Sequence, residues 1–206
     1  MALITSVIVS GITNLSDARY CAGMGVDMLG FGFEEKHPAY VSPAVFKEIS
    51  GWVAGVKMVG EFASSDSETI NELANEYNLD LVQLEKVYLL DEIEQIEKPV
   101  IQKLLINKDT YESEMQEMME LYKPHVAAFL LHSTDFNSID QTNIKLLKNL
   151  AKKFPVFIGF GLDNNNINQI LKEVKPAGIG LVGGEEIRPG FKNFDALQDV
   201  LEVLED

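Results

Sequence analysis

Two side chains that can take part in proton transfer follow apolar runs with the composition of buried strands. Ser10 follows Ile4–Val9, and His132 follows Val126–Leu131. A histidine can donate or accept a proton near neutral pH, whereas a serine hydroxyl attacks only when a base activates it. We predict that both are catalytic side chains. A polar cap at a strand end and a histidine that merely lines a mouth are the alternatives.

Glycines follow the last two predicted strands, Val156–Gly159 and Ala177–Val182. They are Gly159, Gly161, Gly183 and Gly184. Backbone N–H groups of small residues can bind a phosphate beside a helix N-terminus. Glu185 and Glu186 come next and would repel an anion, which Arg188 could offset. We predict a phosphate site made by these glycines and Arg188; ordinary tight turns are the alternative.

Metal and thiolate ligands are scarce. Cys21 is the single cysteine, so no disulfide within the chain and no thiolate cluster can form, and a packing role is expected for it. The histidines at 37, 125 and 132 are too scattered to indicate a metal site by their spacing. We predict neither a metal nor a cofactor.

The elements that must position these residues alternate regularly. The predicted strands are Ile4–Val9, Met28–Phe33, Gly55–Phe62, Leu79–Leu84, Pro99–Ile106, Val126–Leu131, Val156–Gly159 and Ala177–Val182. Helical patterns follow them: one from Asn14 to about Gly23, one from Ser42-Pro43, one after Ser65, and Tyr88–Ile96, Asp109–Tyr122, Ser138–Phe154, Asn164–Val174 and Asn193–Leu204.

Eight strand–helix units with a mean period of about 26 residues predict an α/β fold, a single-domain (β/α)8 TIM barrel over residues 1–206. A doubly wound open sheet is the competing fold, but it usually has fewer strands and a glycine-rich fingerprint after the first, where this chain has only Gly11. Active sites of such barrels lie on the loops after the strands, so strand ends such as Glu61 and the long loop Glu34–Pro43 could contact a ligand.

Composition and charge limit the classes of binding partner that we expect. The chain has 206 residues, 46% of them hydrophobic, and a net charge of −15, which argues against nucleic acid and anionic membranes as partners. No apolar run is long enough to span a bilayer, and no signal peptide is evident, so we expect a cytoplasmic protein. An anionic ligand would depend on local positive groups. The sequence predicts no oligomeric state.

The motifs IVSGITNLSDA, GVDMLGFGF and HPAYVSP, all within the first 45 residues, resemble those of the phosphoribosylanthranilate isomerase family of tryptophan biosynthesis. The family's patterns are Lys-Ile-Cys-Gly-Ile-Thr-Asn, Gly-Ala-Asp-x-x-Gly-Phe-x-Phe and Ser-Pro-Arg-Tyr-Val-Ser-Pro. The resemblance continues to Pro189-Gly190 and so covers nearly the whole chain. It implies the barrel fold, an Amadori rearrangement of a phosphoribosyl amine, and a small phosphorylated ligand.

Carried over position by position, the resemblance implies lost chemistry. The family's general-base cysteine corresponds to Ser10, the preceding lysine to Ile8, and the general-acid aspartate to His132. The arginine that holds the anthranilate carboxylate corresponds to Ala39. Losing a general base or acid costs about 10²–10⁴-fold in rate. His132 could replace the acid, but no replacement for the base is evident in the sequence.

The resemblance bears on the binding residues in the same way. Strand four ends Gln83-Leu-Glu85-Lys86 where the family has Gln-Leu-His-Gly, so Gln83 is retained and predicted to bind substrate. Phe160 replaces the first of the paired glycines after strand seven, and Gly180 falls near the family's aspartate of strand eight. Three hypotheses stay open: an isomerase of this family, a non-catalytic barrel that binds a phosphorylated ligand, and an enzyme acting on another sugar phosphate.

Overall fold

The computed structural model describes residues 2–183, 186–188, 191–192 and 195–205. Eight of its strands are parallel and close into a barrel, in which each strand pairs with the next in sequence and β8 pairs with β1. The eight are β1 (Ser6–Ser10), β2 (Met28–Gly32), β3 (Lys57–Phe62), β4 (Leu81–Leu84), β5 (Val100–Leu105), β6 (Ala128–His132), β7 (Val156–Ile158) and β8 (Gly178–Val182).

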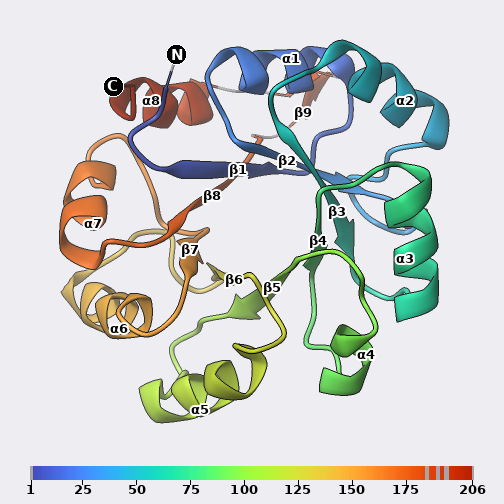
Figure 1. The fold of residues 1–206 in the computed structure, drawn as a ribbon. Helices are drawn as coiled ribbons and strands as arrows, with labels where there is room; N and C mark the ends of the chain where they lie inside the picture. Colours follow the sequence, from blue (N-terminus) through green and yellow to red (C-terminus); the bar gives the residue numbers. More distant parts are fainter. Residues whose placement is uncertain (1, 184–185, 189–190, 193–194, 206) are drawn as a thin grey trace.

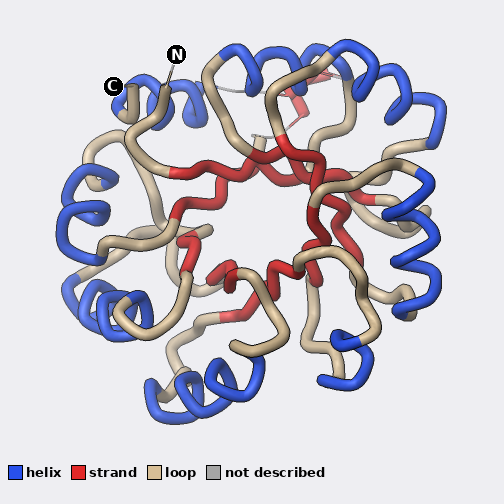
Figure 2. Tube along the Cα trace, viewed as in Figure 1, coloured by secondary structure: helices blue, strands red, loops and turns tan. Residues whose placement is uncertain are grey.

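Helices surround the barrel, as the ring of helices around the strands in Figures 1 and 2 shows. They are α1 (Leu15–Gly23), α2 (Pro43–Trp52), α3 (Ser67–Glu76), α4 (Leu90–Glu94), α5 (Glu112–Tyr122), α6 (Gln141–Ala151), α7 (Ile167–Val174) and α8 (Asp195–Val203). The predicted single-domain (β/α)8 barrel is confirmed, and the open sheet is excluded because β8 pairs with β1.

Local sequence explains how the first helix begins. The side chain of Asn14 caps α1 by accepting a hydrogen bond from the backbone N–H of Asp17 at 2.9 Å. Cys21 is fully buried in the hydrophobic core, as expected for a packing residue. The structure also contains two short antiparallel strands that were not predicted. They are β9 (Glu186–Arg188) and β10 (Phe191–Lys192).

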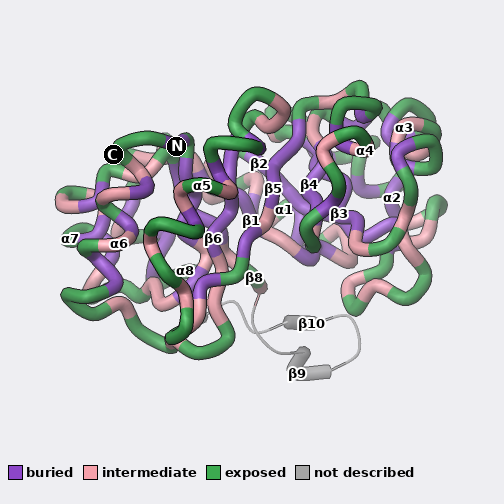
Figure 3. Tube along the Cα trace, turned by 90° about the horizontal axis from the view of Figure 1, so that it is seen from below, coloured by how far each residue is buried: buried purple, intermediate pink, exposed green. Residues whose placement is uncertain are grey.

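Two apolar layers hold the barrel together. Outside the strands, Phe33 stacks on Tyr77 with ring centroids 5.0 Å apart and meets Phe46 edge-on at 5.1 Å, which packs α2 and the end of α3 against the sheet. Figure 3 shows the strands as a buried interior and the outer turns of the helices as exposed. None of the helices in the described part of the chain is long and apolar enough to cross a membrane.

The layer inside the barrel positions the candidate site. Its members are Ile8, Met28, Val59, Leu81, Ile101, Ala128, Leu130 and Phe157. Side chains alternate along a strand, so the residue two positions later also faces inward, one layer nearer the carboxyl end. For β1 to β7 these next residues are Ser10, Gly30, Glu61, Gln83, Lys103, His132 and Gly159, the last of which directly follows β7. A polar or glycine layer therefore lies directly above the apolar plug.

Candidate functional site at the carboxyl end of the barrel

A buried carboxylate lies beside Ser10. Glu61, near the end of β3, is 2% exposed and accepts hydrogen bonds from the Ser10 side chain and, at 3.3 Å, from the backbone N–H of Gly11. Ser10 and Glu61 are on strands that do not pair with each other, because β2 lies between them. The side chain of Glu61 therefore reaches across β2 to the end of β1.

Glycines on β2 leave the room for this reach. Gly30 pairs with Val59 and Gly32 pairs with Glu61 on the neighbouring strand. A Cβ at Gly30 would lie 2.2 Å from Glu61 Oε1 and 3.1 Å from the Cα of Ser10. A Cβ at Gly32 would lie 2.2 Å from Nδ1 of His37. Only glycine allows Glu61 and His37 to occupy these places without displacement.

The surroundings of Glu61 raise the pKa of its carboxyl group. Burial, followed by the negative charge of Glu85, raises the pKa of Glu61 from 4.5 to about 7, although the hydrogen bonds from Ser10 and Gly11 and the charge of Lys103 act in the opposite direction. A carboxyl group with a pKa near 7 exchanges its proton readily at neutral pH, which is the property of a general acid or base.

Gln83 links Glu61 to an ion pair. Its amide nitrogen donates to Glu61 Oε1 at 3.4 Å and to Glu85 Oε1 at 2.5 Å, and its side chain is completely buried. The other oxygen of Glu85 pairs with Nζ of Lys103. Gln83, predicted to bind substrate, therefore holds two carboxylates in place beneath the surface of the site.

His132 ends β6 next to β5, where it pairs with Leu105. Burial and then the positive charge of Lys103 lower the pKa of His132 below 6.5, while the charge of Glu85 opposes this change. His132 therefore lies within the electrostatic reach of the Glu85–Lys103 pair and is mostly uncharged at neutral pH.

A cavity of about 340 Å³, called the mouth cavity below, opens above these groups at the carboxyl end of the barrel. It is lined by Ser10, Gly11, His37, Pro38, Ala39, Glu61, Ala63, Glu85, Lys103 and Val182. The loop predicted to contact a ligand thus contributes three residues to its wall. Ser10 and Glu61 share this cavity, whereas Gln83 lies behind its wall.

Glu34 fixes that loop to the neighbouring one. Its carboxylate accepts the backbone N–H groups of Ala63, Ser64 and Ser65 at 2.6–2.8 Å and also the hydroxyls of both serines. Partial burial would raise the pKa of Glu34, but these hydrogen bonds outweigh it and lower the pKa to about 2. The wall formed by residues 37–39 is therefore anchored to the loop after β3.

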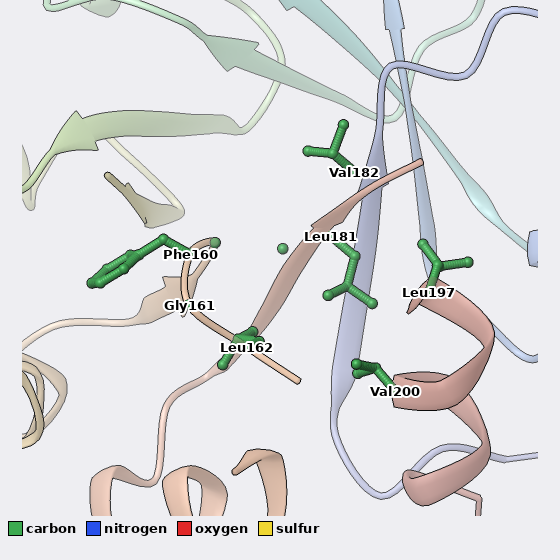
Figure 4. Close-up of a pocket in the computed structure, with 9 residues that line it drawn as sticks. Phe160, Gly161, Leu162, Leu181, Val182, Leu197 and Val200 are labelled. Carbon is green, nitrogen blue, oxygen red and sulfur yellow. The ribbon is translucent and has the colours of Figure 1, made fainter. Parts of the chain in front are cut away.

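A second cavity of about 230 Å³ lies between the ends of β7 and β8 and the start of α8 (Figure 4). Gly159, Gly161 and Gly180 line it with Val182, which also lines the first cavity. Gly161 has a φ of +63°, which favours glycine. In Figure 4 the ring of Phe160 points away from Leu197 and Val200.

The remaining members of the predicted phosphate site are only partly described. Gly183 directly follows β8 but is not among the residues that line the second cavity. Gly184 and Glu185 lie outside the described residues, and so do the side chains of Glu186 and Arg188. Of the residues predicted to form the phosphate site, Gly159 and Gly161 are therefore the two that line the same cavity.

Within the described ranges, no three His, Cys, Asp or Glu side chains come together in a way that could hold a metal ion. The polar side chains at the carboxyl end of the barrel instead contact one another. Gln83 donates a hydrogen bond to Glu85, and Glu85 forms an ion pair with Lys103.

The sequence marked Glu61 only as a strand end that could contact a ligand, and it did not indicate that Glu85 and Lys103 form a pair. The signal that could have found them is the two-residue spacing along each strand: Val59 precedes Glu61, and Ile101 precedes Lys103, as Ile8 precedes Ser10. A charged residue inside an apolar strand, in step with apolar inward positions, indicates a side chain above the plug of a barrel.

Comparison with known proteins agrees with the barrel fold. A profile of the N-(5′-phosphoribosyl)anthranilate isomerase family matches residues 7–203. The isomerase of Geobacter metallireducens is 30% identical over 201 residues, which cover 94% of this chain and 95% of that protein. The isomerase of Marinomonas sp. strain MWYL1 is 28% identical over 205 residues, 94% of each chain.

Solved structures give the same result. The phosphoribosyl anthranilate isomerase of Thermotoga maritima superposes with a TM-score of 0.82 at 25% identity over 98% of each chain. An isomerase structure in complex with reduced 1-(o-carboxyphenylamino)-1-deoxyribulose 5-phosphate superposes with a TM-score of 0.79 at 25% identity, again over 98% of each chain. The resemblance found in the sequence motifs is confirmed: the chain belongs to the N-(5′-phosphoribosyl)anthranilate isomerase family of tryptophan biosynthesis.

Proposed function

We propose that this chain is an active isomerase that converts a phosphorylated ribosyl amine into the corresponding amino-ketose, with Glu61 as the general base. The observation that carries the proposal is the carboxyl group of Glu61, which is 2% exposed, is hydrogen-bonded to Ser10 and borders the mouth cavity. The position that corresponds to the family's base holds a serine, and the carboxylate beside it can do the work that an unassisted hydroxyl cannot.

The reaction requires a proton donor for the ring oxygen and a base for the proton at C2. A proton delivered to the ring oxygen lets the C1–O bond break and leaves an iminium ion at C1. A base then takes the proton from C2, and the electrons of that C–H bond form the C1=C2 double bond of an enaminol. Loss of the enol proton and protonation at C1 complete the ketose. A base with a pKa near 7, as for Glu61, matches the second step at neutral pH.

Ser10 and His132 have supporting roles in this proposal. The Ser10 hydroxyl holds the Glu61 carboxylate at the end of β1 and orients the C2 hydroxyl of the sugar. His132 in its protonated form delivers the proton to the ring oxygen. Because burial and Lys103 lower the pKa of His132 while the pKa of Glu61 is raised, only a minority of molecules carries both groups in the required state. We therefore expect slow turnover.

The phosphate of the substrate is assigned to the second cavity. Supporting this, Gly159 and Gly161 line a space that shares Val182 with the mouth cavity, so one elongated ligand can occupy both. The described side chains around it are apolar, so backbone N–H groups would supply the hydrogen bonds. The ligand of the solved isomerase complex, reduced 1-(o-carboxyphenylamino)-1-deoxyribulose 5-phosphate, likewise carries a phosphate at one end and an arylamino group at the other.

The test is turnover by the purified protein. Freshly prepared N-(5′-phosphoribosyl)anthranilate and the phosphoribosyl amine of aniline are each incubated with the wild type, Glu61→Gln and Glu48→Gln, and the ketose product is measured by chromatography. Glu48 is an exposed glutamate of α2 and serves as the matched control. We expect product from at least one amine, a loss of about 10²-fold or more in Glu61→Gln, and no change in Glu48→Gln.

Product formed at equal rates by the wild type and Glu61→Gln would contradict the role of the carboxylate. No product from either amine would contradict the isomerase. If the protein were then stabilised against heat by inorganic phosphate or ribose 5-phosphate, the non-catalytic binding barrel would be the better account.

A further inference from the structure

The charges that border the mouth cavity are unfavourable for an anionic group. Of the described residues that line it, the charged ones are Glu61, Glu85 and Lys103. The ammonium group of Lys103 is paired with Glu85. With Glu61 ionised, the three side chains carry a net negative charge in a partly buried space, where charges are poorly screened.

Both carboxylate oxygens of Glu85 are engaged. One oxygen of Glu85 pairs with Lys103, and the other accepts the amide of Gln83 at 2.5 Å. The side chains of Glu85 and Lys103 are only 17% and 22% exposed. A ligand carboxylate would compete with Glu85 for Lys103, and displacing Glu85 would leave a largely buried carboxylate without its partner.

In the rest of the described wall, two groups that a ligand could contact are already engaged. Nδ1 of His37 accepts the backbone N–H of Ala39 at 3.1 Å, and the backbone N–H of Gly11 is directed at Glu61. A group with N–H donors, uncharged or protonated, could instead hydrogen-bond to the carboxylates that border the cavity.

We infer that the substituent a ligand places in the mouth cavity is an uncharged or cationic amine and not a carboxylate-bearing ring, so that the preferred substrates are phosphorylated ribosyl amines whose nitrogen substituent carries no negative charge. This inference rests on the proposed function for the ribosyl phosphate part of the ligand. It goes beyond that function by stating which member of the substrate class the site selects.

Two unreactive ligands that differ in one group test it. They are reduced 1-(o-carboxyphenylamino)-1-deoxyribulose 5-phosphate and the same molecule without the ring carboxylate, each titrated into the wild-type protein by calorimetry. We expect the ligand without the carboxylate to bind at least ten-fold more tightly. Equal affinities, or tighter binding of the carboxylated ligand, would overturn the inference.

Glu85→Gln provides a second measurement. Removing that charge releases Lys103 to bind an anion, so the affinity for the carboxylated ligand should rise at least ten-fold, whereas the affinity for the other ligand should change less than three-fold. Glu48→Gln should leave both affinities unchanged. If Glu85→Gln folds and the affinity for the carboxylated ligand does not rise, the inference is contradicted; if it does not fold, the wild-type comparison decides.

Failure of this inference can be told apart from failure of the proposed function. Turnover of N-(5′-phosphoribosyl)anthranilate that depends on Glu61, combined with tighter binding of the carboxylated ligand, would contradict the inference and leave the isomerase standing. Binding of neither ligand, together with absence of turnover, would contradict both.

Discussion

The carboxyl group of Glu61 on β3 reaches over Gly30 of β2 to the hydroxyl of Ser10 at the end of β1. The contact joins two strands that are not neighbours, and it exists because the strand between them has no side chain at the crossing point. Ser10 therefore lies beside a carboxyl group that comes from a residue 51 positions away in the sequence.

Replacing Gly30 by alanine should separate Glu61 from Ser10. The new Cβ would lie 2.2 Å from Glu61 Oε1 and 2.8 Å from its Cδ, so the carboxyl group must move. We expect turnover to fall by about 10²-fold, as if the base were removed, while the fold persists. Gly51→Ala in α2 is the control, because nothing lies within 4 Å of a Cβ there. Unchanged turnover in Gly30→Ala with Glu61 still beside Ser10 would contradict this account.

The raised pKa of Glu61 predicts how stability depends on pH. Because its pKa is about 7 when folded and 4.5 otherwise, the folded state binds a proton more tightly, and ionisation costs stability as the pH rises from 4.5 through 7. Glu61→Gln removes this cost. We expect the variant to be more stable than the wild type by up to about 3 kcal/mol at pH 8 and equally stable at pH 4.5.

Urea unfolding of both proteins at the two pH values measures this difference. A wild type that is as stable as Glu61→Gln at pH 8, with the difference appearing only at low pH, would show that the carboxylate is stabilised rather than strained in the folded protein.

The anchor made by Glu34 has the opposite pH dependence. Its pKa is lowered to about 2, so its contribution to stability is fully present above pH 4.5 and is lost as the pH falls through 2. Glu34 is only partly buried, and solvent screening reduces the effect, so we expect Glu34→Ala to cost about 1 kcal/mol at pH 7. Thermal unfolding is compared with that of Glu35→Ala, an exposed neighbour. An equal effect of the two substitutions would argue against the anchor.

Lys103 should control the protonation of His132. Its positive charge is one of the causes that lower the pKa of His132, so Lys103→Met should raise that pKa towards 6.5. The imidazole resonances, assigned with His132→Ala, report this pKa in an NMR titration. Lys47→Met on the outer side of α2 is the control. A pKa of His132 that stays the same in Lys103→Met would show that the two side chains do not interact.

Much of the fold follows from local sequence. Runs of Ile and Val mark strands that are buried on both faces, and Asn14 caps its helix through a side-chain hydrogen bond that the sequence already indicates. The hairpin of β9 and β10 was missed because its strands of three and two residues carry no apolar run that periodicity could detect.

The site was harder to predict because its groups meet through the barrel. Ser10 and His132 were found because they end strands, but the partnership of Ser10 with Glu61 depends on an intervening glycine and on the register of β2 with β3. Register and strand tilt cannot be obtained from one strand alone. The ion pair of Glu85 with Lys103 joins the residue after β4 to the neighbouring strand β5, and the chain separation of the two residues hides it in the sequence.

The central claim is that Glu61 removes the proton from C2 of the sugar. The most direct measurement is the release of isotope from a phosphoribosyl amine labelled with deuterium or tritium at C2, compared between the wild type and Glu61→Gln. The account predicts release into solvent by the wild type and a loss of about 10²-fold or more in the variant, with the fold intact. Release at the same rate in both proteins would contradict it.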